Sequence, residues 1–153
     1  MKKIIILILF PILLSAQGDL ITETSYNWLT NYNEATKKAQ KENKNILLFF
    51  TGSDWCPPCI ALKKDFLETE AFKEYAESYI LLYIDLPRNK DLLTAEEYRL
   101  NKELASRYNK KSAIPAVNIL NKEGIKLDEM SGYSMNGQLK YHKEFLDKYI
   151  KAN

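Results

Sequence analysis

The chain has few of the residues that build disulfide frameworks or metal centres. Its 153 residues include two cysteines, Cys56 and Cys59, and one histidine, His142. A structural zinc site needs four ligands, usually two cysteine pairs or one pair with histidines, so no metal ion is expected. A purely structural disulfide is a second alternative, but closing so short a loop removes little entropy from the unfolded chain. We also expect no cofactor, and we expect His142 to be a packing residue.

An excess of charge of one sign is absent as well. Lysine and arginine together number 22 and aspartate and glutamate 20, and Lys2 and Lys3 account for the difference. This balance argues against a nucleic-acid partner and against a polybasic membrane patch. The sequence also contains neither a glycine-rich phosphate loop nor a Ser/His/Asp constellation.

The N-terminus has the pattern of a secretory signal peptide. Lys2 and Lys3 precede an apolar stretch over 4–14, and small residues follow, so we expect cleavage after Ala16 or Gly18. The apolar stretch is too short to span a bilayer comfortably. A signal that stays uncleaved as a membrane anchor is the alternative interpretation.

These features divide the chain into a signal peptide, 1–18, and one domain, 19–153. The domain is long enough for a single hydrophobic core. Export would place the two cysteines where disulfides persist, in the bacterial periplasm or, alternatively, outside the cell. No stable membrane insertion is expected after cleavage, and we expect a monomer. With no further cysteines in the domain, the pair is more consistent with a working group than with a stapling framework.

Hydrophobic periodicity predicts alternating helices and strands. Trp28, Tyr32, Ala35 and Ala39 form one apolar stripe of a helix over 27–42. The continuous apolar runs predict strands buried on both faces, and the striped segments between and after them predict helices. The strands are expected at 46–50, 80–84, 116–120 and 125–130, and the further helices from Cys56, at 70–78, from 94 to 108 and at the C-terminus.

Two local signals refine this order. Thr94 and Glu97 have the spacing of a capping box, and residues 121–124 form a turn between the last two strands, which are therefore antiparallel. Strands joined through helices are expected to be parallel with right-handed crossovers. The result is an α/β fold with a mixed central sheet flanked by helices on both faces.

The segment Trp55-Cys56-Pro57-Pro58-Cys59 carries the chemistry. It directly follows the first strand, and Pro57 fits the first turn of a helix. Two sulfurs three residues apart on that turn can close a small disulfide, and the helix N-terminus favours the thiolate of Cys56. Because a thiolate is the species that attacks a disulfide, the pair predicts dithiol/disulfide redox chemistry.

This segment, together with Ile114-Pro115 before a later strand and a closing hairpin and helix, resembles the thioredoxin fold from about residue 27 to 151. Residues 45–67 are similar to exported bacterial thioredoxin-like proteins. The resemblance implies that Cys56 is the attacking nucleophile and Cys59 the resolving cysteine. It also implies that Pro115 is a cis-proline beside the pair, and that Trp55, Ile114 and Pro115 contact the substrate.

The resemblance implies a thiol-disulfide oxidoreductase that acts on protein thiols and disulfides and is recharged by an upstream redox partner. An isoleucine before the cis-proline resembles reductive members, so reductase or isomerase is expected rather than strong oxidant. The alternative is a non-catalytic binding module of the same fold with a static disulfide.

One departure from the family concerns its buried acid–lysine pair. By alignment those positions are Phe50 and Leu81 here, which leaves the proton acceptor for Cys59 unassigned. Asp54 is a nearby carboxylate that fits equally well as a loop residue.

Overall fold

The structure is a computed structural model that describes residues 26–150. The signal peptide expected at 1–18 lies outside the described residues, as does the start of the expected domain. The elements, in chain order, are α1 (Tyr32–Glu42), β1 (Ile46–Thr51), α2 (Pro57–Leu62), the π-helical turn η1 (Lys63–Leu67), the 3₁₀ turn η2 (Glu70–Phe72), α3 (Lys73–Ser78), β2 (Ile80–Asp85), the 3₁₀ turn η3 (Lys90–Leu92), α4 (Ala95–Tyr108), β3 (Ala116–Leu120), β4 (Lys126–Ser131) and α5 (Lys140–Ile150).

The four strands form one mixed sheet in the order β2-β1-β3-β4. β1 is parallel to β2 and antiparallel to β3, and β4 is antiparallel to β3. The predicted mixed sheet is therefore confirmed, as is the hairpin between the last two strands.

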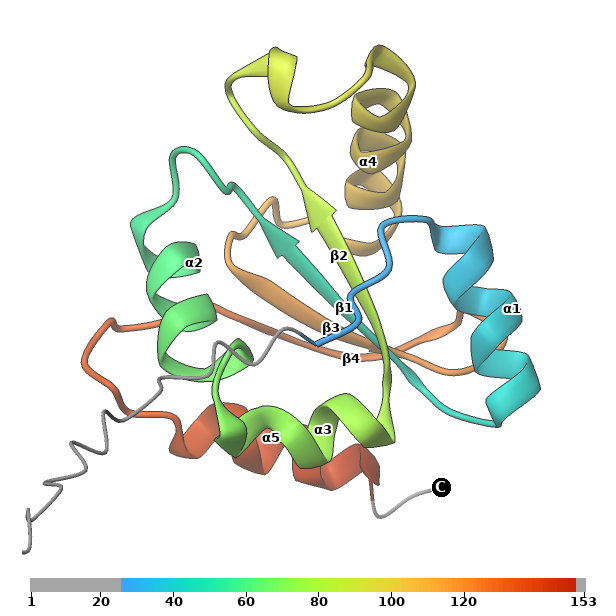
Figure 1. Cartoon of the computed structure of the whole chain (residues 1–153), viewed down its shortest axis with the longest axis vertical. Helices are drawn as coiled ribbons and strands as arrows, with labels where there is room; N and C mark the ends of the chain where they lie inside the picture. The colour runs from blue at the N-terminus through green and yellow to red at the C-terminus, as the bar shows by residue number, and fades with distance from the viewer. Residues whose placement is uncertain (1–25, 151–153) are drawn as a thin grey trace, which may run out of the picture.

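The direction of β3 differs from the sequence expectation. Although α4 connects β2 to β3, these two strands run in opposite directions, because β3 is antiparallel to the strand that β2 parallels. Figure 1 shows why: most of α4 projects past the ends of the strands, and the helix does not run the whole length of the sheet. The chain leaves the sheet at the end of β2 and re-enters it at the same end to begin β3. β3 must therefore run in the direction opposite to β2.

Helices cover both faces of the sheet, as predicted (Figure 1). Leu47 and Phe49 of β1 face a core cluster that includes side chains from α2, α3 and α5. Leu48 and Phe50 face the opposite cluster, which α1 and α4 cover. All six residues of β1 are buried, which explains why the strand is apolar without alternation.

The first helix begins later than its hydrophobic stripe indicates. The helix predicted over 27–42 starts at Tyr32, because the Asn31 side chain accepts a hydrogen bond at the helix N-terminus. Leu29, two residues earlier, instead forms a parallel bridge to β2. Trp28 still packs against the core, so it keeps the stripe while lying outside the helix.

The other predicted elements are present within a residue or two of their expected bounds. The capping box at the start of α4 is confirmed: the Glu97 N–H donates to Thr94 Oγ1 at 3.2 Å, and the Thr94 N–H donates to Glu97 Oε2 at 2.8 Å. Within residues 26–150, no helix has the length and apolar character needed to cross a membrane. The same residues contain no group of three His, Cys, Asp or Glu side chains arranged to hold a metal ion.

Candidate redox site

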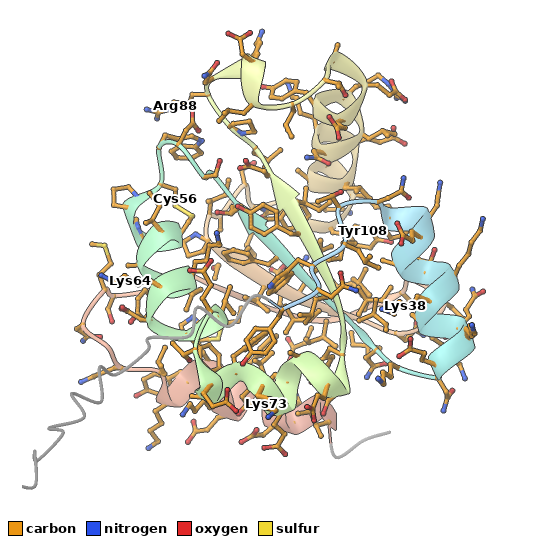
Figure 2. The ribbon with its side chains drawn as sticks, in the orientation of Figure 1. Lys38, Cys56, Lys64, Lys73, Arg88 and Tyr108 are labelled. Atoms are coloured by element: carbon orange, nitrogen blue, oxygen red, sulfur yellow. A yellow bond between two sulfur atoms is a disulfide. The ribbon has the colours of Figure 1, made fainter. Side chains whose placement is uncertain are left out.

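The two cysteines lie where β1 ends and α2 begins, and they form a disulfide. Cys56 is the residue that caps α2, and its carbonyl accepts hydrogen bonds from the N–H groups of Cys59 at 3.0 Å and Ile60 at 3.1 Å. Both cysteines are largely covered, with exposed fractions of 3% for Cys56 and 1% for Cys59. Their different positions on the helix, rather than their exposure, distinguish them. Figure 2 shows Cys56 near the same end of the sheet as Arg88, which lies in the loop after β2.

A tight turn delivers the chain from β1 to Cys56. The Gly52 carbonyl accepts hydrogen bonds from the N–H groups of Trp55 at 3.2 Å and Cys56 at 2.9 Å. A Cβ atom on Gly52 would lie 2.4 Å from Cε2 of the Trp55 ring. Glycine is therefore required here so that the indole can lie against the turn.

The Trp55 side chain is fixed on two sides. Its Nε1–H donates to the Leu86 carbonyl at 2.8 Å, and the Arg88 guanidinium lies 4.6 Å from the centre of its ring. Both partners belong to the loop after β2. A cation over an indole face is attracted by the ring quadrupole, so the contact holds the aromatic wall beside Cys56 in place.

The carboxylate of Asp85 ties the turn to the end of β2. Its Oδ1 accepts from the Ser53 N–H at 2.9 Å and its Oδ2 from the Ser53 hydroxyl at 2.5 Å. Asp85 has an exposed fraction of 9%, and its own carbonyl accepts from Asn101 Nδ2 of α4 at 2.9 Å. The residue thus connects the turn before the cysteines to both β2 and α4.

Asp54 forms a second link between the same two loops. Its carboxylate accepts from the backbone N–H groups of Asn89 at 2.7 Å and Arg88 at 3.0 Å. These hydrogen bonds, the one from Asn89 foremost, hold the pKa of Asp54 below its usual range. The loop role considered for Asp54 is the one that the contacts support.

The Ile114–Pro115 peptide bond is cis, as expected. Pro115 is buried, and its carbonyl accepts from the Gly132 N–H at 2.9 Å, which joins this segment to the end of β4. Ile114 and Trp55 line the same groove, so the structure brings these two predicted site residues together. The expected contact between Pro115 and the Cys56 sulfur remains a prediction.

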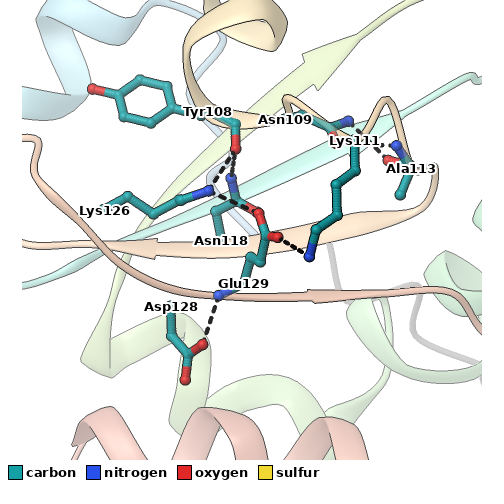
Figure 3. Close-up of polar contacts among 8 residues, drawn as sticks. All are labelled: Tyr108, Asn109, Lys111, Ala113, Asn118, Lys126, Asp128 and Glu129. Atoms are coloured by element: carbon teal, nitrogen blue, oxygen red, sulfur yellow. Dashed lines mark hydrogen bonds and ion pairs between the residues drawn. The ribbon is translucent and has the colours of Figure 1, made fainter.

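Side-chain contacts shape the loop that leads to Ile114 (Figure 3). The Asn109 side chain donates from Nδ2 to the Ala113 carbonyl at 2.8 Å and accepts from the Ala113 N–H at 3.1 Å. Just before it, the Tyr108 carbonyl accepts from Asn118 Nδ2 of β3 at 2.7 Å and from Lys126 Nζ of β4 at 3.2 Å. The end of α4 is thereby fastened to the sheet.

The alignment of the family's buried charge pair needs a correction. Phe50 and Leu81 lie on opposite faces of the sheet, so they are not the two positions of one contact. Leu47 and Phe49 are the β1 residues that share a face with Leu81. The position is apolar in either register, and the loss of both charges leaves no orphan buried ion.

His142 lies on α5 and packs against the loop after β4. It has an exposed fraction of 7% and meets the edge of the Tyr133 ring at 5.6 Å between centres. Burial lowers the pKa of His142, and a hydrogen bond with the Gly132 backbone acts in the opposite direction. The packing role expected for His142 agrees with this environment.

Among the residues that shape the site but were given no role from the sequence are Gly52, Asp85 and Asn109. Gly52 and Asp85 each stand at the end of a buried apolar run, which was a usable signal. Asn109 follows a helix of ordinary composition, and its bridging role depends on a loop conformation that the pattern does not encode.

Comparisons with known proteins agree with this geometry. Residues 27–122 match the family model described as thioredoxin-like. The chain is 32% identical over 122 residues to the disulfide bond reductase DsbH of Chlamydia pneumoniae, covering 79% of this chain and 71% of that protein. It is 38% identical over 72 residues to anterior gradient protein 2-B of Xenopus laevis, covering 46% of this chain and 43% of that protein.

Solved structures give the same result. A DsbH oxidoreductase superposes with a TM-score of 0.72 at 28% identity, covering 90% of this chain and 92% of that one. Thioredoxin O2 of Arabidopsis thaliana superposes with a TM-score of 0.53 at 19% identity, covering 82% and 96%, which shows the fold alone. The chain therefore belongs to the thioredoxin-like family, and its Cys56–Cys59 pair makes it a thiol-disulfide oxidoreductase of that family.

Proposed function

We propose that the protein is an exported reductase of protein disulfides. The observation that carries the proposal is the position of Cys56 at the start of α2, beside Trp55 and next to a reducible partner, Cys59. The similarity to a protein named as a disulfide bond reductase favours reduction over oxidation. Export follows from the signal-peptide pattern over 1–18, and the working domain would be 19–153.

In the proposed reaction the protein enters as the dithiol. The Cys56 thiolate, favoured by the helix N-terminus, attacks one sulfur of the substrate disulfide, and the other sulfur leaves as a thiolate that takes up a proton. Cys59 then loses its proton and attacks Cys56 in the mixed disulfide. The substrate leaves with two thiols, and the protein keeps the Cys56–Cys59 disulfide.

The cycle needs an external thiol donor. The disulfide form returns to the dithiol when a second thiol protein supplies two electrons and two protons by the same exchange run in reverse. This is the upstream redox partner that the proposed function requires.

Substrate binding is assigned to Trp55, Ile114 and Pro115. Trp55 provides an aromatic wall that two contacts hold still, and Ile114 faces the same groove. A fixed apolar wall offers contact area at little entropic cost to an extended substrate segment.

Mixed-disulfide trapping tests the two cysteine roles. Cys59→Ala should accumulate an adduct with a disulfide-containing protein, because the attacking group remains and the resolving group is gone. Cys56→Ala should accumulate none. Non-reducing gels of both variants after the same exposure decide the assignment, and equal adduct levels would mean that the roles are wrong.

Insulin reduction by dithiothreitol separates the enzyme from a binding module with a static disulfide. A reductase accelerates precipitation of the insulin B chain, and a Cys56→Ser variant does not. The reduction potential of the pair in a glutathione buffer then decides the direction, since a reductase must lie below the potential of its substrates. Mass spectrometry of the N-terminus of the exported protein tests cleavage after Ala16 or Gly18.

A further inference from the structure

A groove runs between α4 and the Trp55 indole at the edge of the redox site. It has a volume of about 660 Å³, and Trp55 and Ile114 are part of its lining. Tyr98 and Lys102 of α4 and Lys110 just after this helix line it as well. The groove is therefore continuous with two of the residues assigned to substrate binding.

The lining of this groove is positively charged. Lys102 and Lys110 are among its residues, and none of its residues is acidic. The amino groups of Lys90 and Lys102 lie 5.9 Å and 5.7 Å from the centre of the Tyr98 ring. Tyr98 thus makes cation–π contacts with two lysines.

Arg88 adds a further cation where it stacks over Trp55. Within residues 26–150, none of Arg88, Lys90 and the two groove lysines forms an ion pair. The positive charge of Arg88 contributes to the lowered pKa of Asp54, whose oxygens already accept hydrogen bonds from the backbone N–H groups of Arg88 and Asn89.

The acidic residues of α4 are engaged on other faces of the helix. Glu96 and Glu103 bind Arg99 at 2.8 Å and 3.2 Å, and Glu97 closes the capping box with Thr94. None of these three glutamates lines the groove. The helix therefore keeps its acids away from the side that faces Trp55, although the chain as a whole is nearly neutral.

We propose that this groove binds acidic side chains that flank the disulfide of a protein substrate. The inference rests on the proposed function, because it places the acidic segment beside the disulfide that Cys56 attacks. Uncompensated cations at a groove rim attract carboxylates and orient an incoming segment before chemistry occurs. The preferred substrates are then disulfides with Asp or Glu within a few residues.

Two peptides and two double variants test the proposal. Each peptide contains one intramolecular disulfide, flanked by glutamates in the first and by glutamines in the second. Stopped-flow fluorescence of the reduced protein against peptide concentration gives a half-saturation concentration and a limiting rate. The test variant is Lys102→Gln/Lys110→Gln, and the control is Lys37→Gln/Lys41→Gln on α1, which changes the net charge equally at two exposed lysines that do not line the groove.

We expect the test variant to raise the half-saturation concentration for the glutamate peptide about fivefold, from two exposed charge pairs, with the limiting rate unchanged. The glutamine peptide and the control variant should show no change, and 0.5 M salt should remove the preference in the natural protein. Equal behaviour of both peptides with the natural protein would overturn the groove assignment while leaving the reductase intact.

Two other results have separate meanings. Failure of the natural protein to reduce either peptide would count against the proposed function itself. A concentration-dependent dimer that dissociates in the Lys102→Gln/Lys110→Gln variant, measured by light scattering, would mean that a second copy occupies the groove, and would also overturn the proposal.

Discussion

Asp85→Ala should be the most damaging single substitution around the redox site that leaves both cysteines in place. The change removes the acceptors for the Ser53 N–H and the Ser53 hydroxyl in a site where Asp85 is only 9% exposed. Hydrogen bonds to a charged group contribute about 1.5–3 kcal/mol each, and a buried N–H without an acceptor adds a penalty. We therefore expect the free energy of unfolding to fall by about 3–5 kcal/mol.

Urea denaturation of the oxidised protein measures this loss, and two variants serve as controls. Ser53→Ala removes only the hydroxyl donor and should cost about 1–2 kcal/mol. Asp54→Ala breaks contacts between the same two loops but at the surface, where water replaces the lost acceptor, so its loss should be smaller than that of Asp85→Ala. Because Asp85 and Ser53 are in contact, the double variant should lose less than the sum of the two single losses.

The same experiment extends to reactivity. If Asp85 positions the turn before Cys56, its removal should also slow insulin reduction at temperatures where the variant is folded. A loss below about 1 kcal/mol for Asp85→Ala, or strict additivity with Ser53→Ala, would refute the view that this carboxylate fixes the turn.

Three further substitutions give sharp expectations. Gly52→Ala should displace the Trp55 ring and cost about 1–3 kcal/mol, because the new Cβ would lie 2.4 Å from Cε2; tryptophan fluorescence and urea denaturation would detect this, and an unchanged spectrum would contradict it. Asn109→Ala should cost about 1–3 kcal/mol, because the buried Asn109 side chain makes both hydrogen bonds to Ala113, while Asn109→Asp should retain one of them; equal losses would argue against the loop role. For His142, burial lowers the folded-state pKa below the ordinary 6.5, so the unfolded chain binds the proton first and stability should fall as the pH drops below 6.5, by at most about 1.4 kcal/mol per pH unit. His142→Gln should remove this part of the pH dependence in denaturation at pH 7.5 and 5.5, and identical slopes would exclude His142 as its source.

The sequence alone predicted the elements whose signals are local. The apolar runs located β1 and β2, and the Thr94/Glu97 spacing located the start of α4, because both signals lie inside the element they define. The predicted start of α1 was wrong for a physical reason. Trp28 faces the same core from an extended segment that pairs with β2, so the apolar stripe continues past the point where the helix begins.

The direction of β3 required information that no local signal holds. A helix between two strands predicts a parallel crossover only if the helix travels back along the sheet. α4 does not run the length of the sheet, although its last turns pack on one face, and nothing in its composition distinguishes it from a helix that does (Figure 1). The hairpin of β3 and β4 was predictable because its turn residues are local.

The hydrogen bonds between Asp85 and Ser53 were neither as predictable as the local elements nor as unpredictable as the direction of β3. The residues are 32 positions apart, so no local pattern joins them. Each follows a buried apolar run, however, and parallel neighbouring strands end at the same edge of a sheet. Polar residues at or just after the ends of two such strands are therefore candidates for contact. Asp85, the last residue of β2, meets Ser53, two residues after β1, in this way at the turn that carries Cys56. The same reasoning explains why the loop after β2, rather than any segment near the cysteines in sequence, supplies the partners that hold Trp55 in place.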